Sequence, residues 1–393
     1  MDTVREYLIR THGSPDGIDP GRWNALLNRQ SEPTPFLRHE YLAALHRSGS
    51  ACVDTGWQPH ITTVEVDGDL VAGTWAYHKS HSYGEYVFDW AWADAYRRHG
   101  LRYYPKLLAA VPFTPVSGSR LLAIDEASRN VLVAAVRQQA LTLQLSSAHA
   151  LFLTPAEVVA CRNDGWMIRQ GVQFHWVQDS ERPVADFSDL LARLQRDKRK
   201  NILQERRKVV EAGLRISVHQ GTDITARLWD FFYSCYLETY RQHHSSPYLT
   251  REFFGLMASA MPENWLLFIA WEGDTPVASS LIAIDPVMRK AWGRYWGASK
   301  YVPCLHFEMC YYQPLAWCIL NGYTRFEGGA QGEHKMARGL LPVTTSSAHW
   351  LSDTRFANAV AEYLAQEGQG MAAYVDELRD RSPYRSGMEP GSN

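Results

Sequence analysis

The sequence lacks the features that define several large classes of protein. No apolar run approaches the roughly 18 residues that a membrane span needs, and the first residues lack the basic and then apolar pattern of a signal peptide. Charge of one sign does not dominate, because 40 basic and 42 acidic residues give a net charge of -2. This balance argues against a protein that coats nucleic acid with its whole surface, but it allows a local basic patch.

Cysteine is also scarce, and its spacing carries little information. The six cysteines form no Cys-x-x-Cys pair, and Cys304, His306 and Cys310 fit no zinc signature. The Gly-x-Ser-x-Gly elbow, the Walker loop and the His-Glu-x-x-His motif are absent. We therefore expect reduced thiols, no metal and no cofactor, in a cytoplasmic enzyme or binding protein.

Aromatic residues are abundant, at 12% of the 393 residues with 14 Trp and 20 Tyr. Wide aromatic surfaces suit either a deep core or a large-ligand cleft, and composition alone does not choose between them. With 46% hydrophobic and 21% charged residues, the chain has an ordinary globular composition. Its length suggests two or three domains.

The chain repeats itself at an offset of 205 residues. Residues 61–73 and 266–279 each read as strand, acidic-Gly turn and strand, with Gly68 aligned to Gly273. The same offset aligns the aromatic-rich segments 87–92 and 292–297, which we interpret as strands. A helix is predicted after each, at 103–110 and about 305–320, followed by strands near 120–122 and 323–327. The repeat predicts two similar mixed α/β domains, at 1–180 and 181–393, with a frayed tail after about residue 380.

Several long motifs resemble a known family. They are PFLRHEY at 35–41, KSHSYGEYVFDWAW at 79–92, YPKLL at 104–108, PFTPV at 112–116 and GGAQGEHKMARG at 328–339. Together with the element order, they resemble the Gcn5-related N-acyltransferase (GNAT) fold in tandem, as in the Fem-type peptidyl and aminoacyl transferases. The closer resemblance, over about residues 17–374, is to the bacterial Fem-like "peptidoglycan biosynthesis/recognition" family. It implies a mixed α/β fold of two tandem GNAT-like domains, the first binding the acceptor and the second carrying the reaction.

The Gly-rich segment 328–339 is the most informative candidate site. Its glycines allow close backbone approach to a ligand. We expect Glu333 or His334 to act as the base and Lys335 and Arg338 to hold a carboxylate or phosphate. The alternative is a surface turn with solvated charges.

A second candidate lies in the first half. Lys79, His81, Tyr83 and Glu85 alternate, so a strand would present them on one face. Asp89, Trp90, Trp92 and Asp94 are expected to continue this strand. Two acids beside aromatic rings would suit an amine acceptor. The alternatives are a solvent-facing strand and a Trp-rich core.

A basic helix is expected over 187–213, capped by Ser188 and ended by Gly213. It carries a net charge of +4 in a chain of net -2. It is interpreted as a contact for the phosphates of an aminoacyl-tRNA donor or of a nucleotide-linked acceptor, or alternatively as a solvated face. The residues assigned to this contact are Arg196, Lys198, Arg199, Lys200, Arg206 and Arg207.

A sequence motif bears on the identity of the donor. Enzymes that use acyl-CoA hold its pyrophosphate with an Arg/Gln-x-x-Gly-x-Gly/Ala loop at the start of the helix after the central strand. At that place the sequence reads Arg294 to Ser299, with Ser at the last position. A second near miss, at 97–102, ends in a bulky Arg. The literal match at 325–330 follows the predicted helix instead of preceding it. This pattern favours a donor other than acyl-CoA.

The sequence therefore predicts an acyltransferase that moves an acyl or aminoacyl group from aminoacyl-tRNA to a small amine-bearing acceptor, with no covalent enzyme intermediate. Arg294 and Trp296 are expected to contact substrate, and backbone amides of a splayed strand near Gly297 to stabilise the oxyanion. Two alternatives stay open. One is an acyl-CoA-dependent N-acyltransferase, and the other is a non-catalytic module that recognises a peptide or cell-wall fragment.

Overall fold

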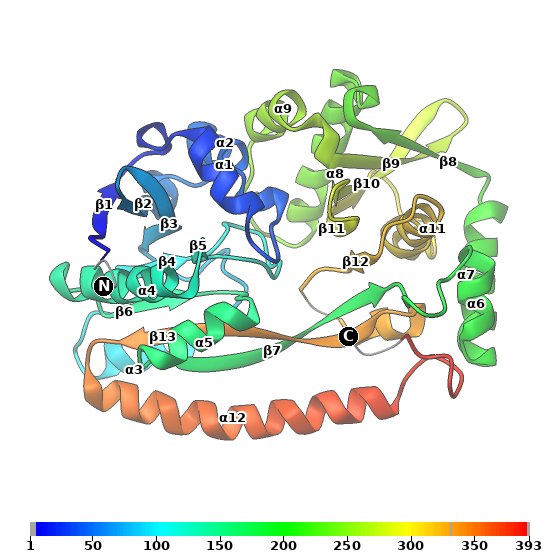
Figure 1. Ribbon diagram of the computed structural model, residues 1–393. Coiled ribbons are helices and arrows are strands. Elements are labelled where there is room, and N and C mark those ends of the chain that lie inside the picture. Colours follow the sequence, from blue (N-terminus) through cyan, green and yellow to red (C-terminus); the bar gives the residue numbers. More distant parts are fainter. Residues whose placement is uncertain (1–4, 331, 391–393) are drawn as a thin grey trace. The chain divides into compact units, whose positions relative to one another are not determined.

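The computed structural model describes residues 5–330 and 332–390 of the chain (Figure 1). The chain forms two compact units, and each contains its own run of paired strands and its own helices. Unit 1 consists of residues 1–171 and 344–373, and unit 2 of residues 172–343 and 374–393. Across the described ranges, no helix is long and apolar enough to cross a membrane.

Unit 1 is built on a sheet with the strand order β1-β2-β3-β4-β6-β13. All neighbours are antiparallel except β4 and β6, and β5 pairs with β3. Asp67 and Gly68, both at positive φ, make the tight turn between β2 and β3. The strands are β1 Leu8–His12, β2 Trp57–Val66, β3 Asp69–Lys79, β4 Lys106–Ala109, β5 Leu122–Ala123, β6 Ser147–Ala150 and β13 Leu341–Leu351.

The helices of unit 1 bury apolar residues against this sheet. Leu132, Val133 and Val136 of α4 pack with Leu107 of β4 and Ala148 of β6 in one buried cluster. The helices are α1 Pro20–Asn28, α2 His39–Arg47, α3 Trp90–Arg98, α4 Glu126–Thr142, α5 Pro155–Asn163 and most of α12 Thr354–Asp380.

Unit 2 has the strand order β7-β12-β11-β10-β9-β8, antiparallel except for the pair of β11 and β12. The strands are β7 Met167–Val177, β8 Leu214–Gln220, β9 Trp265–Glu272, β10 Thr275–Asp285, β11 Lys290–Ala298 and β12 Arg325–Glu327. The helices are α6 Phe187–Arg193, α7 Arg196–Glu211, α8 Ala226–Gln242, α9 Arg251–Ala260, α10 Leu305–Phe307 and α11 Gln313–Leu320. A π-helical turn, Glu308–Tyr312, joins α10 to α11.

The structure confirms the two predicted hairpins, β2–β3 and β9–β10, and the helical segment after β11. The predictions for the matching part of the first half are wrong. Residues 87–92 run from a loop into α3, and Lys106–Ala109 forms strand β4 instead of a helix. The loop forms because Asp89 is tied to the buried Lys106 of β4, a contact that sequence periodicity does not reveal.

The predicted boundary near residue 180 differs from the observed units. The chain crosses from one unit to the other three times, within β7, β13 and α12. In the described part of the tail expected to fray after about residue 380, Tyr384 is buried and its hydroxyl donates to the Gly339 carbonyl oxygen at 2.7 Å.

The prediction of a single basic helix over 187–213 is also wrong. This segment forms two helices, α6 and α7. The break lies between them because Leu194 has an extended backbone (ψ 155) and the Gln195 N–H donates to the Pro383 carbonyl oxygen. Asp186, not Ser188, caps α6. Gly213, at φ 74, follows the end of α7 as predicted.

Candidate functional site

The Gly-rich segment leaves β12 as a loop and then forms a 3-10 turn, Glu333–Arg338. Its position 331 lies outside the described residues. Gly328 is closely packed, since a Cβ there would lie 2.7 Å from Leu340 Cδ2. The 3-10 turn places side chains against α10 and the π-helical turn. We call this group the Lys335 cluster; it consists of His306, Phe307, Tyr311, His334, Lys335 and Arg338.

Lys335 is a buried amine with few partners. Its side chain is 3% exposed, and Nζ donates to the Gly329 carbonyl oxygen at 3.0 Å. Desolvation lowers the pKa of Lys335 to about 8. Within the described ranges, no carboxylate pairs with it. An anionic ligand would therefore restore the charge that burial disfavours.

His334 is positioned as a neutral imidazole. Its Nε2 lies 3.1 Å from the Tyr311 hydroxyl, on the π-helical turn. Desolvation and the nearby cations Arg338 and Lys335 lower the pKa of His334 below its usual value. Near pH 7 the ring is therefore free to accept a proton. Single π-helical turns of this kind occur frequently at functional sites.

Arg338 is held rigidly beside these groups. Its guanidinium lies 3.0 and 3.1 Å from the two carboxylate oxygens of Glu205 and donates to the His334 carbonyl oxygen at 2.6 Å. It also stacks on Phe307, with its central carbon 3.6 Å from the ring centroid. The predicted anion clamp is therefore engaged with Glu205, so Lys335 is the less compensated cation of the two.

Glu333, the other predicted base, lies away from this cluster. Its carboxylate accepts a hydrogen bond from the Tyr374 hydroxyl and pairs with Arg381 at 3.4 Å. It is half-exposed, at 49% of its side-chain surface. The structure therefore separates Glu333 from His334, although the two are adjacent in sequence.

The predicted substrate contacts on β11 lie close to the cluster. The Trp296 ring meets the His306 ring edge-on, with centroids 5.5 Å apart, whereas Arg294 stacks on its neighbour Tyr295. The parallel pairing of β11 with β12 covers only Lys290–Trp292. Residues 293–298 thus extend past the end of β12, as a splayed strand would. Gly297 is required by packing, since a Cβ would lie 2.1 Å from the Cys235 carbonyl oxygen.

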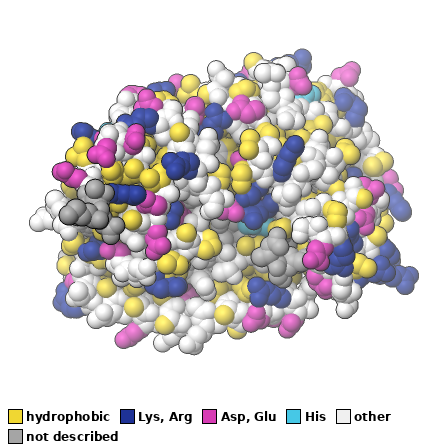
Figure 2. Space-filling view, viewed as in Figure 1, with side chains coloured by type: hydrophobic (Ala, Val, Ile, Leu, Met, Phe, Trp, Pro, Cys, Tyr) yellow, Lys and Arg dark blue, Asp and Glu magenta, His cyan; other side chains and the backbone are white. Residues whose placement is uncertain are grey.

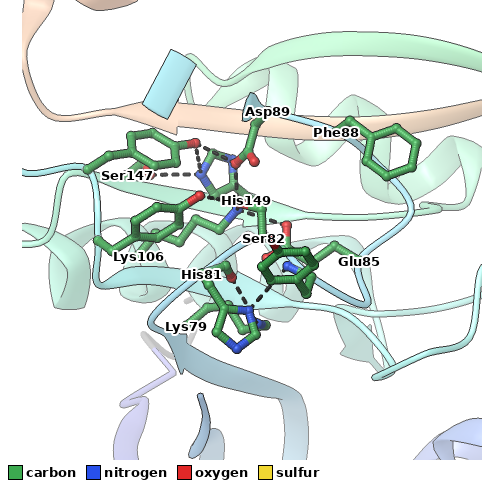
Figure 3. Close-up of polar contacts among 12 residues, drawn as sticks. Lys79, His81, Ser82, Glu85, Phe88, Asp89, Lys106, Ser147 and His149 are labelled. Atoms are coloured by element: carbon green, nitrogen blue, oxygen red, sulfur yellow. Dashed lines mark hydrogen bonds and ion pairs between the residues drawn. The ribbon is translucent and has the colours of Figure 1, made fainter. Parts of the chain in front are cut away.

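Unit 1 contains a second buried polar group, the Lys106 cluster, shown in Figure 3; it consists of Ser82, Glu85, Asp89, Tyr103 and Lys106. Lys106 is fully buried, and Nζ donates to Ser82 Oγ at 3.0 Å, to Glu85 at 2.8 Å and to Asp89. Desolvation opposes its charge, but the two carboxylates raise the pKa of Lys106 overall. All three protons of this ammonium are therefore used inside the protein.

The two carboxylates of this cluster differ. Desolvation raises the pKa of Glu85 to about 7, with Lys106 opposing it. For Asp89, desolvation acts in the same direction, but Lys106 and His149 outweigh it and hold the pKa below its usual value. Asp89 is therefore the permanent counter-ion of Lys106, and Glu85 is the member that can change protonation near neutral pH.

A chain of polar contacts continues from Asp89 into the sheet. The Tyr103 hydroxyl donates to Asp89 at 2.6 Å and lies 3.2 Å from His149 Nε2. His149 Nδ1 faces His349 Nδ1 at 2.8 Å, so one ring donates and the other accepts. Burial lowers the pKa of both rings, to about 3 for His349. Both are therefore neutral structural groups.

Lys79 and His81 form a separate pair beside this cluster. Lys79 Nζ lies 2.7 Å from His81 Nδ1 and 4.3 Å from the Trp57 ring centroid. Desolvation lowers the pKa of Lys79 to about 7. Lys79 is thus a buried amine that is partly neutral near pH 7.

The expected alternating strand over 79–94 is wrong. β3 ends at Lys79, and the loop that follows buries its polar side chains and exposes aromatic ones. Tyr83 is 58% exposed and Trp90 40%, and their rings meet at 5.0 Å. Asp94 lies on α3 in surface ion pairs with Arg97 and Arg98. Asp89 and Asp94 are therefore not paired in one acceptor site.

Comparison with known proteins identifies the family. A family profile described as peptidoglycan biosynthesis/recognition, FemAB-like, matches residues 14–386. This chain belongs to the FemAB-like family. A search of curated proteins finds no match for it.

Solved structures share the fold of this FemAB-like chain. The C-terminal domain of a putative lysylphosphatidylglycerol synthetase from Agrobacterium fabrum aligns with a TM-score of 0.54 and 12% identity, over 91% of this chain and 96% of that one. FemX aligns with a TM-score of 0.53 and 10% identity, over 91% and 100%. L-PGS from Bacillus licheniformis aligns with a TM-score of 0.52 and 11% identity, over 85% and 93%. These likenesses establish the tandem GNAT-type fold.

Two of the six basic residues that were assigned to the RNA contact are held in ion pairs in this FemAB-like chain. Arg206 is bound to the buried Glu308 at 3.1 Å, and Lys198 pairs with Asp197 at 3.1 Å. The remaining predicted contacts lie on the outer side of α7, where Arg199 is half-buried and Arg196, Lys200 and Arg207 are exposed. Figure 2 shows Lys and Arg side chains gathered at the right-hand edge, over α6 and α7.

Sequence reasoning missed several residues of both clusters. One signal was present for the histidines, because the tripeptide Ser-Ala-His occurs at both 147–149 and 347–349, and these segments pair in β6 and β13. Lys106 and Tyr103 carried no such signal. Tyr311 and Phe307 were hidden in an apolar helix whose π-helical turn alters which side chains face the loop.

Proposed function

We propose that this FemAB-like protein transfers an activated acyl or aminoacyl group to an amine, with its reaction centre at the Lys335 cluster. The observation that carries the proposal is the position of the His334 imidazole. Its Nε2 is within hydrogen-bond distance of the Tyr311 hydroxyl, its pKa is lowered, and it lies beside the buried Lys335 amine. A base that is neutral at pH 7 and an uncompensated cation together suit attack by an amine on an anionic or phosphate-bearing ester.

In the proposed reaction, the lone pair of the neutral acceptor amine attacks the ester carbonyl carbon. The nitrogen, positively charged once the new C–N bond forms, gives a proton to His334. Backbone amides of β11 beyond Trp292 support the oxyanion, since that stretch extends past its parallel partner. Collapse of the tetrahedral intermediate breaks the ester bond, and the departing oxygen takes a proton from His334. Lys335 binds an anionic part of a substrate. No enzyme side chain is acylated.

The donor is proposed to be aminoacyl-tRNA, the substrate that the resemblance to Fem-type transferases implies. The cation-rich cluster is compatible with an adjacent phosphate, which an RNA 3′ end would supply. An acyl-CoA thioester is the second candidate, and the poor match of residues 294–299 to the pyrophosphate loop disfavours it. The acceptor is proposed to be a small peptide, an amino acid or a cell-wall precursor with a free amine. Acceptor binding in unit 1 stays a prediction.

A donor screen tests the proposal. Purified protein is incubated with amines and peptides plus either charged tRNAs or acyl-CoAs, and loss of the ester or thioester is followed. We expect amine-dependent deacylation of tRNA, reduced at least about a hundredfold in the double variant Lys335→Ala, Arg338→Ala. If the protein released CoA from acyl-CoA but did not deacylate tRNA, the donor would be acyl-CoA instead of aminoacyl-tRNA. Binding of acceptor without turnover of any donor would identify a recognition module, and full activity in the double variant would exclude this cluster as the reaction centre.

A further inference from the structure

The outer side of α7 exposes two large aliphatic residues in one line. Leu203 is 49% exposed and Val210 is 73% exposed. They are seven residues apart, which places them within about 20° on the helix and roughly 10 Å apart along it. The buried side of the same helix carries Ile202 and Val209, at 2% each. The fold therefore uses one apolar stripe of α7 for its core and leaves a second one on the surface.

Basic residues lie on both sides of this exposed stripe. By helical geometry Arg196, Arg207 and Lys200 lie along one side and Arg199 along the other, each within about 60° of Leu203. In the part of the chain that the structure describes, none of these four is in an ion pair. The same helix carries Asp197 in its first turn, paired with Lys198, and Glu211 at its end. We call this surface the α7 ridge; it consists of Arg196, Arg199, Lys200, Leu203, Arg207 and Val210.

The aliphatic and the basic residues of the ridge together indicate its partner. An RNA backbone would bind the basic residues, but it would make no favourable contact with two protruding aliphatic side chains. A protein core partner would use the aliphatic residues but would be opposed by four uncompensated cations around them. An anionic lipid surface uses both, because aliphatic side chains enter the boundary of headgroups and acyl chains while Lys and Arg contact the phosphates.

We propose that the α7 ridge docks this protein on the surface of an anionic phospholipid bilayer. Leu203 and Val210 enter the headgroup region, and the flanking Arg and Lys side chains contact lipid phosphates. The contact is peripheral and reversible, since two aliphatic side chains cannot anchor a protein permanently. The inference does not depend on the proposed transfer reaction, because the ridge contributes no member to the Lys335 cluster.

Vesicle flotation tests this inference. Full-length protein is mixed with vesicles of phosphatidylcholine alone, or with 30% phosphatidylglycerol, at about 0.1 M salt. We expect binding only to the anionic vesicles, a partition coefficient about tenfold lower for Leu203→Ser, Val210→Ser, and strong loss in 0.5 M salt. Each charge-reversing substitution of a basic ridge residue, such as Lys200→Glu, should lower the partition coefficient by at least about fivefold.

The matched control is Val287→Ser, Leu320→Ser, which removes two aliphatic residues exposed at 89% and 81% outside the ridge. It should bind vesicles like the wild type. Thermal unfolding of each variant separates docking from folding. A parallel filter-binding assay measures tRNA affinity. Absence of binding to anionic vesicles would overturn the inference. So would wild-type vesicle binding by Leu203→Ser, Val210→Ser. If the charge-reversing substitutions weakened only tRNA binding and left vesicle binding unchanged, the ridge would be an RNA-binding surface.

Discussion

The Lys106 cluster and the Lys335 cluster treat a buried ammonium group in opposite ways. Lys106 has two carboxylates and a hydroxyl as acceptors, and its pKa is raised. Lys335 has one backbone carbonyl, and its pKa is lowered to about 8. Both side chains are 3% exposed or less. Both lysines are buried, and the main difference between them lies in the supply of counter-charge.

This difference separates a structural role from a chemical one. A buried ion pair with every proton satisfied is closed to further ligands, and it fixes the loop that carries Tyr83 and leads into α3. A buried amine without a counter-ion weakens the fold unless a ligand supplies the missing charge. We expect four sets of variants to test this contrast, from the largest effect to the smallest.

The largest effect is expected at Lys106. The variant Lys106→Met leaves the Asp89 carboxylate buried and unpaired, so the free energy of unfolding should fall by about 3–5 kcal/mol. Urea denaturation measures this loss. Arg97→Ala, which removes a surface ion pair with Asp94, is the matched control and should leave the urea midpoint nearly unchanged. Equal losses in the two variants would contradict the assignment of the Lys106 cluster as a structural anchor.

The second effect concerns His334. Replacement by Asn keeps a polar group opposite Tyr311 but removes the base, so the transfer rate should fall by about 10²–10⁴-fold with stability nearly unchanged. In the wild type, the pKa of His334 is lowered, so the rate should hold through pH 6.5 and fall only at lower pH. Steady-state rates against pH provide the measurement. A rate that declined already above pH 6.5 would assign the base elsewhere.

The third effect is the pH dependence that Lys335 imposes on stability. Its pKa is about 8 in the folded protein and 10.5 when unperturbed, so the unfolded chain binds more protons between these values. Stability should therefore rise from pH 8 to 10.5 in the wild type relative to Lys335→Met, by at most about 3 kcal/mol. Below pH 8 the difference should be constant. Added phosphate should reduce it, since an anion supplies the missing charge.

The smallest effect is expected at Glu333. Because its carboxylate binds Tyr374 and Arg381 on the surface, Glu333→Gln should change the transfer rate less than about threefold and stability by about 0.5 kcal/mol. Measured beside His334→Asn, it forms a matched pair of adjacent substitutions. A loss as large as that of His334→Asn would mean that Glu333 takes part in the reaction after all.

Local patterns in the sequence were sufficient where a short segment determines its own shape. The acidic-Gly turns at Gly68 and Gly273 predicted both hairpins, and the long motifs predicted the tandem GNAT-like fold. In the Gly-rich segment, residues 333–338 form a 3-10 turn, and His334 and Lys335 lie together there.

Prediction failed where a partner distant in sequence decides the structure. The alternation over 79–85 resembles a strand, yet Lys106 holds Glu85 in a loop. The orientation of Glu333 depends on Tyr374, which is 41 residues further on. The break between α6 and α7 depends on Pro383, whose carbonyl oxygen accepts the Gln195 N–H. None of these contacts leaves a periodic trace in the sequence.

The three crossings of the chain between its units have a practical consequence for protein engineering. Because unit 1 takes residues 344–373 and unit 2 takes residues 374–393, no single cut yields two self-contained pieces. A fragment that stops near residue 340 lacks β13 and α12 of unit 1, as well as Tyr384, which contacts Gly339 in unit 2. Either half expressed from one continuous gene segment should be incomplete, and co-expressed fragments should recover activity only by reassembling the whole chain.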